Sequence, residues 1–292
     1  MRNSQKKAIF FALLAAVLYA INSPFSKLLL SKVSETFMAA FLYLGAGLGL
    51  FIIGAFQKLS GKKEKEKPLT KKELPYTIAM VVLDIAAPIF LMLGLANTTA
   101  ANASLLNNFE IVATSLIALA IFKEAISKRL WIAIVLVTIS SAILSFEDMS
   151  SLSFSVGSLF VLLACVCWGF ENNCTRCLSS KDPLQIVVIK GFGSGLGSLI
   201  IAFFLGESLP NFIYVVLALL LGFVAYGLSI YFYIYAQRDL GAAKTSTYYA
   251  VAPFIGAGLS MLIFLKLPPI SYFIGLVIMI LGTYFASSDN KE

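Results

Sequence analysis

Apolar stretches of about 20 residues recur along the whole chain and are separated by short polar breaks. A stretch of this length crosses a hydrocarbon core of about 30 Å as a single helix. The predicted spans cover residues 8–30, 36–57, 74–95, 101–122, 129–146, 155–178, 183–205, 211–236, 243–265 and 269–286. The pattern therefore predicts an all-α integral membrane protein with ten transmembrane helices and almost no sequence left for a soluble domain.

The overall composition agrees with this pattern. Of the 292 residues, 59% are hydrophobic and 13% are charged, and the mean hydropathy is +0.90. Soluble domains contain about 45–50% apolar residues, so the composition excludes an ordinary soluble protein. The opening "MRNSQKK" precedes an apolar run as in a secretory signal, but no small-residue cleavage site follows, and we expect a retained first helix.

The net charge of +7 would suggest a nucleic-acid partner if the basic residues formed a single surface. They lie instead in alternate loops: the segment "KLSGKKEKEKPLTKKE" alone holds seven lysines. Cytoplasmic loops of membrane proteins carry this excess of Lys and Arg. We therefore expect both termini in the cytoplasm, a location in the cytoplasmic (plasma) membrane, the lipid bilayer as a partner, and no nucleic acid.

Two halves of the chain resemble each other in sequence. The segment "LLAAVLYAINSPFSK" (13–27) aligns with "LLACVCWGFENNCTR" (162–176), "GAGLG" (45–49) with "GSGLG" (193–197), and "AANAS" (100–104) with "AAKTS" (242–246). The three alignments keep the same order and nearly the same offset. They indicate a duplication, with a first repeat at 1–146 and a second at 147–292.

Each repeat holds five spans, and an odd number makes equivalent helices cross the membrane in opposite directions. Inverted repeats of this kind are typical of secondary transporters, which bind a substrate near the bilayer midplane between the halves and expose it to each side in turn. The prediction is thus two inverted five-helix repeats around a central cavity. Because the halves are already fused, we expect a monomer.

The chain resembles the drug/metabolite transporter superfamily and, within it, the EamA-like transporter family. The resemblance covers essentially the whole chain and rests on the ten spans, on "CWGFENN" in the sixth span and on "SLLNNFEIV" in the fourth. It implies a ten-helix fold around a central cavity. It also implies a protein that transports amino acids, amines, nucleobases, sugar phosphates or toxic metabolites. The family often has Glu-Pro in both halves, whereas here Glu110 precedes Ile111 and Ala252 precedes Pro253.

Three carboxylates, those of Asp84, Glu110 and Glu171, lie inside predicted spans. Each costs about 2.5–3.5 kcal/mol at a helix centre, so we expect them to face a cavity or a cation rather than lipid. The cations within or near the ends of spans are Lys27, Arg176, Lys190 and Lys244. Two interpretations stay open for each carboxylate: a substrate or proton site, or a buried ion pair that holds helices in register.

Neighbouring polar and aromatic residues favour the first interpretation. Asn107 and Glu110 follow the spacing of one helix face, and Trp168 lies one turn before Glu171, where a ring and a carboxylate could hold an ammonium group. The substrate-binding candidates are Tyr19, Asn22, Asp84, Asn107, Glu110, Trp168, Glu171, Tyr248 and Tyr249. Because the chain has no histidine, proton coupling would have to use Glu110 and Glu171.

Three prolines predict kinks inside spans, because proline displaces the carbonyl four residues before it. Pro88 acts on the carbonyl of Asp84, and Pro24 and Pro253 act on those of Ala20 and Tyr249. All four cysteines lie in the sixth span, where we expect packing thiols, with no metal and no cofactor.

The sequence therefore favours a secondary transporter, proton-coupled or exchanging, for a small organic metabolite such as an amino acid, amine or nucleobase. A membrane-embedded enzyme and a facilitative channel are the alternatives. We expect no enzyme, because the chain has no histidine, no nucleotide loop and no serine-centred elbow. The polar groups occur singly on different spans and form no evident filter sequence.

Overall fold

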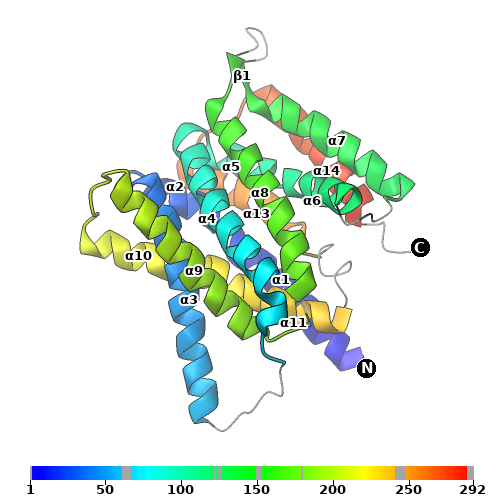
Figure 1. Cartoon of the computed structure of the whole chain (residues 1–292). Helices are drawn as coiled ribbons and strands as arrows, with labels where there is room; N and C mark the ends of the chain where they lie inside the picture. The colour runs from blue at the N-terminus through cyan, green and yellow to red at the C-terminus, as the bar shows by residue number, and fades with distance from the viewer. Residues whose placement is uncertain are drawn as a thin grey trace.

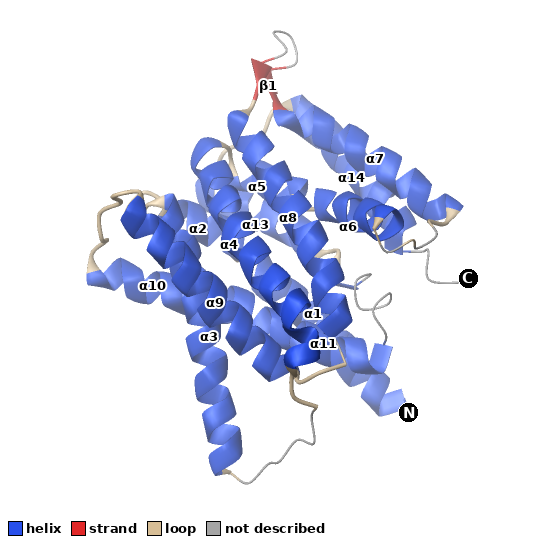
Figure 2. Cartoon of the chain, in the orientation of Figure 1, coloured by secondary structure: helices blue, strands red, loops and turns tan. Residues whose placement is uncertain are grey.

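The computed structural model describes residues 2–60, 67–121, 123, 126–148, 153–178, 180–240 and 248–287. Most of the described residues are helical, as Figure 1 and Figure 2 show. The helices are α1 (Arg2–Ala20), α2 (Asn22–Leu29), α3 (Glu35–Leu59), α4 (Leu74–Asn97), α5 (Ala100–Leu106), α6 (Phe109–Ala120), α7 (Lys128–Ser145), α8 (Val156–Leu178), α9 (Pro183–Phe204), α10 (Phe212–Gly222), α11 (Ser229–Leu240), α13 (Ala252–Phe264) and α14 (Ile270–Ser287), with a 3-10 turn at Lys71–Glu73 and a π-helical segment at Phe223–Leu228.

Each predicted span coincides, within the described residues, with a helix or with consecutive helical segments. Eight helical segments are long and apolar enough to cross a membrane, and α13 and α14 are shorter apolar helices. Many large apolar side chains are exposed on the outside, including Phe56, Phe204 and Leu217, as expected for a surface that contacts lipid. The predicted ten-helix membrane protein is confirmed. The start of the predicted ninth span, 243–247, lies outside the described residues.

Several spans are interrupted rather than continuous, which the hydropathy pattern did not predict. The first span breaks at Ile21, between α1 and α2, three residues before Pro24. Proline has no N–H to donate to the carbonyl of Ala20, and its ring displaces that carbonyl. The fourth span breaks at Asn107 and Asn108, between α5 and α6. Asparagine side chains can form hydrogen bonds to nearby backbone groups in place of the regular helical bonds. Here the side chain of Asn108 donates to the carbonyl of Leu105 at 3.3 Å.

One short hairpin departs from the all-α prediction. Strands β1 (Phe146–Asp148) and β2 (Ser153–Phe154) pair antiparallel, with Phe146 opposite Phe154. Figure 2 shows this strand pair at the top, projecting from the ends of α7 and α8. It lies where a loop was predicted between the fifth and sixth spans, and the fold class is unchanged.

The packing of the helices repeats itself when the two halves are exchanged. α4 packs on α8 as α11 packs on α1, and α6 packs on α8 as α13 packs on α1. α4 packs on α9 as α10 packs on α3, while α3 with α9, α5 with α13 and α7 with α14 pair equivalent helices directly. A two-fold relation between two five-helix halves produces this pattern, and with five spans per half it corresponds to an inverted repeat.

Glycine allows α3 and α9 to touch at the centre of the molecule. A Cβ atom on Gly191 would lie 2.4 Å from the Cα and N atoms of Gly47, and 2.9 Å from the carbonyl oxygen of Tyr43. These neighbours are backbone atoms, which cannot move aside as a flexible side chain can. Small residues drive helix association in membranes in the same way, because they let two backbones approach closely.

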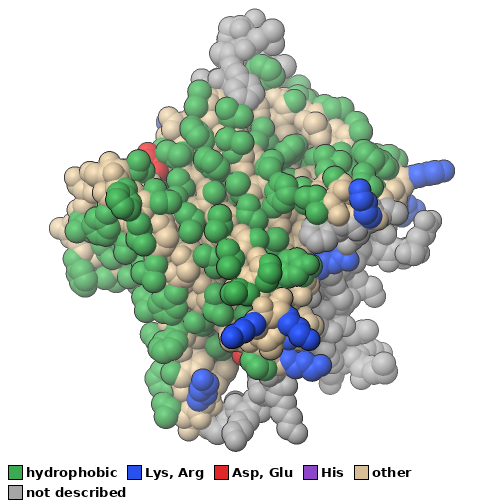
Figure 3. Space-filling model, viewed as in Figure 1, with side chains coloured by type: hydrophobic (Ala, Val, Ile, Leu, Met, Phe, Trp, Pro, Cys, Tyr) green, Lys and Arg blue, Asp and Glu red, His purple; other side chains and the backbone are tan. Residues whose placement is uncertain are grey.

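The two ends of the helices differ in charge. Lys6, Lys58, Lys72, Lys128 and Lys181 lie at one end, which we call the lysine-rich side. The opposite end carries the β1–β2 pair and is called the hairpin side. Figure 3 shows Lys and Arg side chains mainly at the lower and right-hand edges of a largely hydrophobic face. This distribution is the one that the loop charges predicted.

On the hairpin side, the second half caps a helix of the first. The carboxylate of Glu207 accepts from the hydroxyl of Ser34 at 2.6 Å and from the backbone N–H groups of Thr36 and Phe37 at 3.3 and 3.1 Å. A carboxylate at a helix N-terminus satisfies N–H groups that have no partner within the helix and interacts favourably with the helix dipole. The loop after α9 thereby fixes the start of α3.

The α3–α9 contact leads to a first prediction. Gly191→Ala should lower the free energy of unfolding by about 1–3 kcal/mol, because the added methyl group overlaps backbone atoms of α3. Gly258→Ala is the matched control, since a Cβ there meets no atom within 4 Å, and it should leave stability unchanged or slightly higher. Thermal unfolding of both variants in the same detergent measures the difference. Equal melting temperatures would contradict a close contact at Gly191.

Candidate functional site

An ammonium group between two carboxylates lies in the interior of the helix bundle. Lys190 on α9 places its Nζ 3.0 Å from Oδ2 of Asp84 on α4 and 3.0 Å from Oε1 of Glu171 on α8. The three residues are 7%, 0% and 2% exposed, respectively. α4 packs on both α8 and α9, which is how residues so distant in the sequence come together. We call these three residues the ion cluster.

Hydroxyl groups complete the ion cluster. Tyr43 on α3 donates to Oδ1 of Asp84 at 2.8 Å, and Thr175 donates to Oε1 of Glu171 from the next turn of α8. Trp168 is buried one turn before Glu171 and lies next to the Tyr43 hydroxyl. Further hydrogen bonds to the carboxylates help a buried ion pair to offset its desolvation, and Tyr43 and Thr175 supply one to each carboxylate. Asp84 and Glu171 are therefore ion-paired with Lys190 in this structure.

Glu110 differs from the other two carboxylates. Its Oε1 accepts from Nδ2 of Asn172 at 2.5 Å, and the same nitrogen lies 3.4 Å from the hydroxyl of Thr114. Glu110 is close enough to Lys190 and Glu171 for electrostatic interaction, but among the described residues no cation is paired with it. Glu110 is also only partly buried. It is thus the carboxylate whose charge is least compensated.

The break in the fourth span changes the environment of Glu110. Asn107 and Glu110 were predicted to share one face of a continuous helix, but α5 ends before Asn107 and α6 begins at Phe109. The continuous helix is wrong here, because two asparagines interrupt it. Glu110 instead occupies the first turn of α6, where the helix dipole favours a negative charge. Asn107 is 6% exposed, and its Oδ1 has no hydrogen-bond partner among the described residues.

A chain of aromatic rings runs beside the carboxylates. Ring centroids are 5.1 Å apart for Tyr43 and Tyr226, 5.9 Å for Tyr226 and Tyr19, 5.9 Å for Tyr19 and Tyr249, and 4.9 Å for Tyr249 and Tyr233. Tyr19, Tyr226 and Tyr249 all lie within electrostatic range of Glu110. These rings therefore form an aromatic group near the Glu110 carboxylate. Tyr248 is half-buried and takes part in none of these ring contacts within the described residues.

The broken first span positions Asn22. Asn22 opens α2, is 1% exposed, donates to the hydroxyl of Tyr226 at 3.3 Å and accepts from the hydroxyl of Ser26 at 3.0 Å. Pro24 lies in the first turn of α2, and Pro253 lies in the first turn of α13, just after the turn at Ala250 and Val251. Proline is well tolerated there, because the first turn of a helix has no N–H partner to lose. Pro88 lies inside a continuous α4.

The structure brings most of the sequence-predicted residues into one region and adds others. Contacts described above link Tyr19, Asn22, Asp84, Trp168, Glu171 and Tyr249, and Glu110 lies within electrostatic range of Glu171. Tyr43, Asn172, Lys190 and Tyr226 were not among the predicted site residues but contact them directly. One signal for Tyr43 and Tyr226 was available: a tyrosine in the middle of an apolar span usually needs a partner for its hydroxyl.

The four cysteines are free thiols on α8. Cys165 is buried, and its thiol points at the carbonyl oxygens of Leu106 and Asn107 at 3.6 and 3.8 Å. Those carbonyls belong to the break between α5 and α6. Cys165 therefore packs against the break as a weak hydrogen-bond donor.

Comparison with protein-family models matches the EamA-like transporter family over residues 6–146 and 155–288. The chain belongs to the EamA-like transporter family. The two matched segments together cover nearly the whole chain, and the sequence resemblance to this family is confirmed. The chain is a membrane transporter of that family.

Two further comparisons agree with this family. An uncharacterized transporter of Methanothermobacter thermautotrophicus is 26% identical over 299 aligned positions, which cover 95% of this chain and 85% of that protein. A solved crystal structure that is 14% identical superimposes with a TM-score of 0.68 and covers 96% of this chain and 95% of that one. At this identity, the solved structure supports the fold alone.

The two halves of this EamA-like transporter carry different chemistry at equivalent places. In the aligned repeats, Asn22 corresponds to Glu171, and Lys190 corresponds to Leu42. Asn22 is bonded to Tyr226 on the π-helical segment, whereas Glu171 shares a lysine with Asp84 on α4, the equivalent span. The contact between the first and eighth spans is thus neutral, whereas the equivalent contact between the sixth and third spans is charged.

The ion cluster leads to a second prediction. Lys190→Met should lower the free energy of unfolding by about 3–5 kcal/mol, because two buried carboxylates would lose their cation. A triple variant, Asp84→Asn, Glu171→Gln and Lys190→Met, should recover much of this loss, since it removes both charges that had been left unpaired. Thermal unfolding in detergent compares the two variants with Lys32→Gln, an exposed lysine, as the control. A Lys190→Met protein as stable as the unaltered one would contradict the ion cluster.

Proposed function

We propose that this EamA-like transporter is a secondary active transporter that exchanges a small organic metabolite, such as an amino acid, amine or nucleobase, for protons by alternating access. The substrate-binding residues of this proposal are Glu110, the ion cluster and the tyrosines beside them. Glu110 carries the exchanged proton, and Glu171 is linked to it through their mutual electrostatic interaction.

The single observation behind the proposal is an imbalance of charge. In the helical interior that the structure describes, Lys190 is shared by Asp84 and Glu171, and Glu110 is bonded to the neutral amide of Asn172. An uncompensated carboxylate at membrane depth is costly, so Glu110 is neutralised either by a proton or by a cationic group of a substrate. Since it accepts one or the other, binding of the substrate releases the proton, and this competition is the basis of exchange.

The aromatic rings support a substrate with a positive group. The rings of Tyr19 and Tyr249 contact each other at a tilt, and both lie within electrostatic range of Glu110. The face of an aromatic ring attracts a cation, and the attraction grows when the cation is shielded from water. A carboxylate flanked by such rings is suited to an ammonium group, which favours amines and amino acids among the candidate substrates.

Contacts on the lysine-rich side support closure of the transporter at that end. Lys181 lies 3.2 Å from Glu73, the backbone N–H of Asp182 donates to the carbonyl of Lys67 at 2.9 Å, and Gln185 accepts from the N–H of Leu69 at 2.8 Å. Residues 67–73 belong to the first half and residues 181–185 to the second. In a cycle of alternating access these contacts would break when the site opens toward the lysine-rich side.

The proposal also covers the membrane in which the protein lies, its orientation there and its oligomeric state. It places the transporter in the cytoplasmic membrane with the lysine-rich side and both termini in the cytoplasm, in line with the positive-inside rule. The halves are 1–146 and 147–292, and the protein acts as a monomer without a cofactor and without enzymatic activity.

The third prediction tests coupling at Glu110. A thermal-shift screen of the purified protein with amino acids, choline, polyamines and nucleobases first identifies solutes that stabilise the folded state. Each stabilising solute, radiolabelled, should then accumulate in proteoliposomes when a pH gradient is imposed, and a protonophore should abolish the accumulation. Glu110→Gln should reduce this gradient-driven uptake by about 10-fold or more, because the proton site is lost.

Glu35→Gln is the control, since Glu35 lies at the N-terminus of α3 on the hairpin side, away from Glu110. It should leave uptake unchanged. Non-saturating uptake that ignores the pH gradient would indicate a channel, and conversion of the solute without any sealed compartment would indicate an enzyme. Either result would refute proton exchange.

A further inference from the structure

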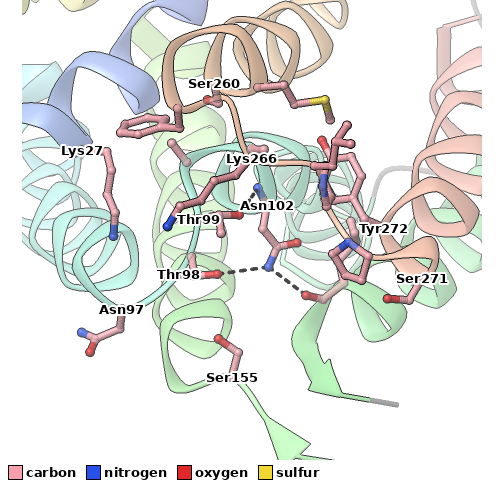
Figure 4. Close-up of a pocket in the computed structure, with 18 of the residues that line it drawn as sticks. Lys27, Asn97, Thr98, Thr99, Asn102, Ser155, Ser260, Lys266, Ser271 and Tyr272 are labelled. Carbon is pink, nitrogen blue, oxygen red and sulfur yellow. Dashed lines mark hydrogen bonds between the residues drawn. The ribbon is translucent and has the colours of Figure 1, made fainter. Parts of the chain in front are cut away.

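A chamber of about 580 Å³ lies on the hairpin side of the molecule, apart from the carboxylates. Figure 4 shows its polar lining, with Lys27, Asn102, Lys266 and Tyr272 among the labelled residues. α2, α4 and α5 of the first half line it, together with α13, α14 and the loop between them from the second. Asp84, Glu110 and Glu171 are not part of its lining. The chamber is therefore separate from the site proposed above.

The charged groups that line the chamber are all positive. Lys27 and Lys266 approach the same space from different halves, close enough to repel each other electrostatically. Among the described lining residues there is no Asp or Glu, and no carboxylate is paired with either lysine in the part of the chain that the structure describes. Within the described residues, the chamber thus has an excess of positive charge.

Lys27 keeps a donor available for a ligand. Its ammonium group donates to the carbonyl oxygens of Leu95 and Ala96, the latter at 3.1 Å, in the last turn of α4. An ammonium group has three donors, so one N–H is left. The carbonyls hold Lys27 in place and interact with its charge through the helix dipole, but they carry no full negative charge.

Tyr272 provides an independent indication of a ligand. It lines the chamber and is 4% exposed, and its hydroxyl has no hydrogen-bond partner among the described residues. Buried hydroxyl groups are nearly always paired in folded proteins, because an unpaired one loses its bonds to water without replacement. A ligand in the chamber would supply the missing partner. Beside Tyr272, the side chains of Leu144, Met261 and Phe264 give the chamber an apolar wall.

We propose that the chamber binds a small organic carboxylate. The carboxylate group would lie between Lys27 and Lys266 and accept from the hydroxyl of Tyr272, while the body of the molecule packs on the apolar wall. Charge-assisted hydrogen bonds of this kind are about twice as strong as neutral ones. Because the two lysines belong to different halves, the ligand would bridge the halves at their hairpin-side ends. The proposal does not depend on proton exchange at Glu110.

The fourth prediction uses a matched pair of probes and the full chain in lipid nanodiscs. Line broadening in ¹⁹F NMR measures binding of 4-fluorophenylacetate and of its neutral analogue, 4-fluorophenylacetamide, which has nearly the same shape. The acid should bind about 10-fold or more tightly than the amide, because only the acid carries the charge that the lysines attract. Equal affinities, or no measurable binding of the acid, would overturn the proposal.

Single substitutions locate the binding. Lys266→Gln should weaken binding of the acid by about 10-fold, Lys266→Arg should retain it, and Tyr272→Phe should weaken it about 3- to 10-fold without lowering the melting temperature. Lys32→Gln is the control, since Lys32 is another exposed lysine of the hairpin side but does not line the chamber. If Lys32→Gln weakened binding as much as Lys266→Gln, general surface charge would explain the effect and the chamber would be excluded.

Discussion

Lys190 is the residue on which the interior of this transporter depends. Lipid tails are as apolar as the helices, so burial of apolar surface gives the helices little reason to associate inside a membrane, and close packing and polar contacts decide their arrangement. Lys190 joins α9 to α4 and α8 through two carboxylates, and Tyr43 extends the connection to α3. One ammonium group thus links four helices taken from both halves. It is stable there because each of its partners is itself hydrogen-bonded.

The glycine contact and the ion cluster are parts of one arrangement. Lys190 immediately precedes Gly191, whose Cα lies against Gly47, and Tyr43 lies one turn before Gly47. The distance at which α3 and α9 pack therefore also sets the distance from Lys190 and Tyr43 to Asp84. A bulkier residue at the contact would move both polar groups at once. Gly47 and Gly191, the small residues at this contact, thus influence the geometry of the charged ones.

Much of this architecture could be predicted from the sequence, and the reasons for the exceptions are physical. Hydropathy predicted the ten spans because a bilayer imposes a similar length on every helix that crosses it. Asp84, Glu110 and Glu171 could be singled out because charged residues are rare inside such spans. Hydropathy could not show that Lys190 is the partner of Asp84, since the two are far apart in sequence and meet only through the packing of α4 on α9. The break at Asn107 was missed because the surrounding residues are apolar enough for an unbroken span. Asn172 directly follows Glu171 on α8 and so lies on a different helix face, which is consistent with its contact to Glu110.

The unequal halves have an energetic consequence. In an inverted repeat, exchanging the conformations of the two halves converts an inward-open protein into an outward-open one, and identical halves would give the two forms equal free energy. Here the contact of Asn22 with Tyr226 joins the first and eighth spans, and its equivalent, the contact of Glu171 with Asp84 through Lys190, joins the sixth and third spans. A dipolar contact and an ionic one respond differently to being opened to water, so under the proposed alternating access the empty protein would have a preferred resting orientation. The direction of that preference is a property of the sequence itself, present before any solute or gradient acts on it.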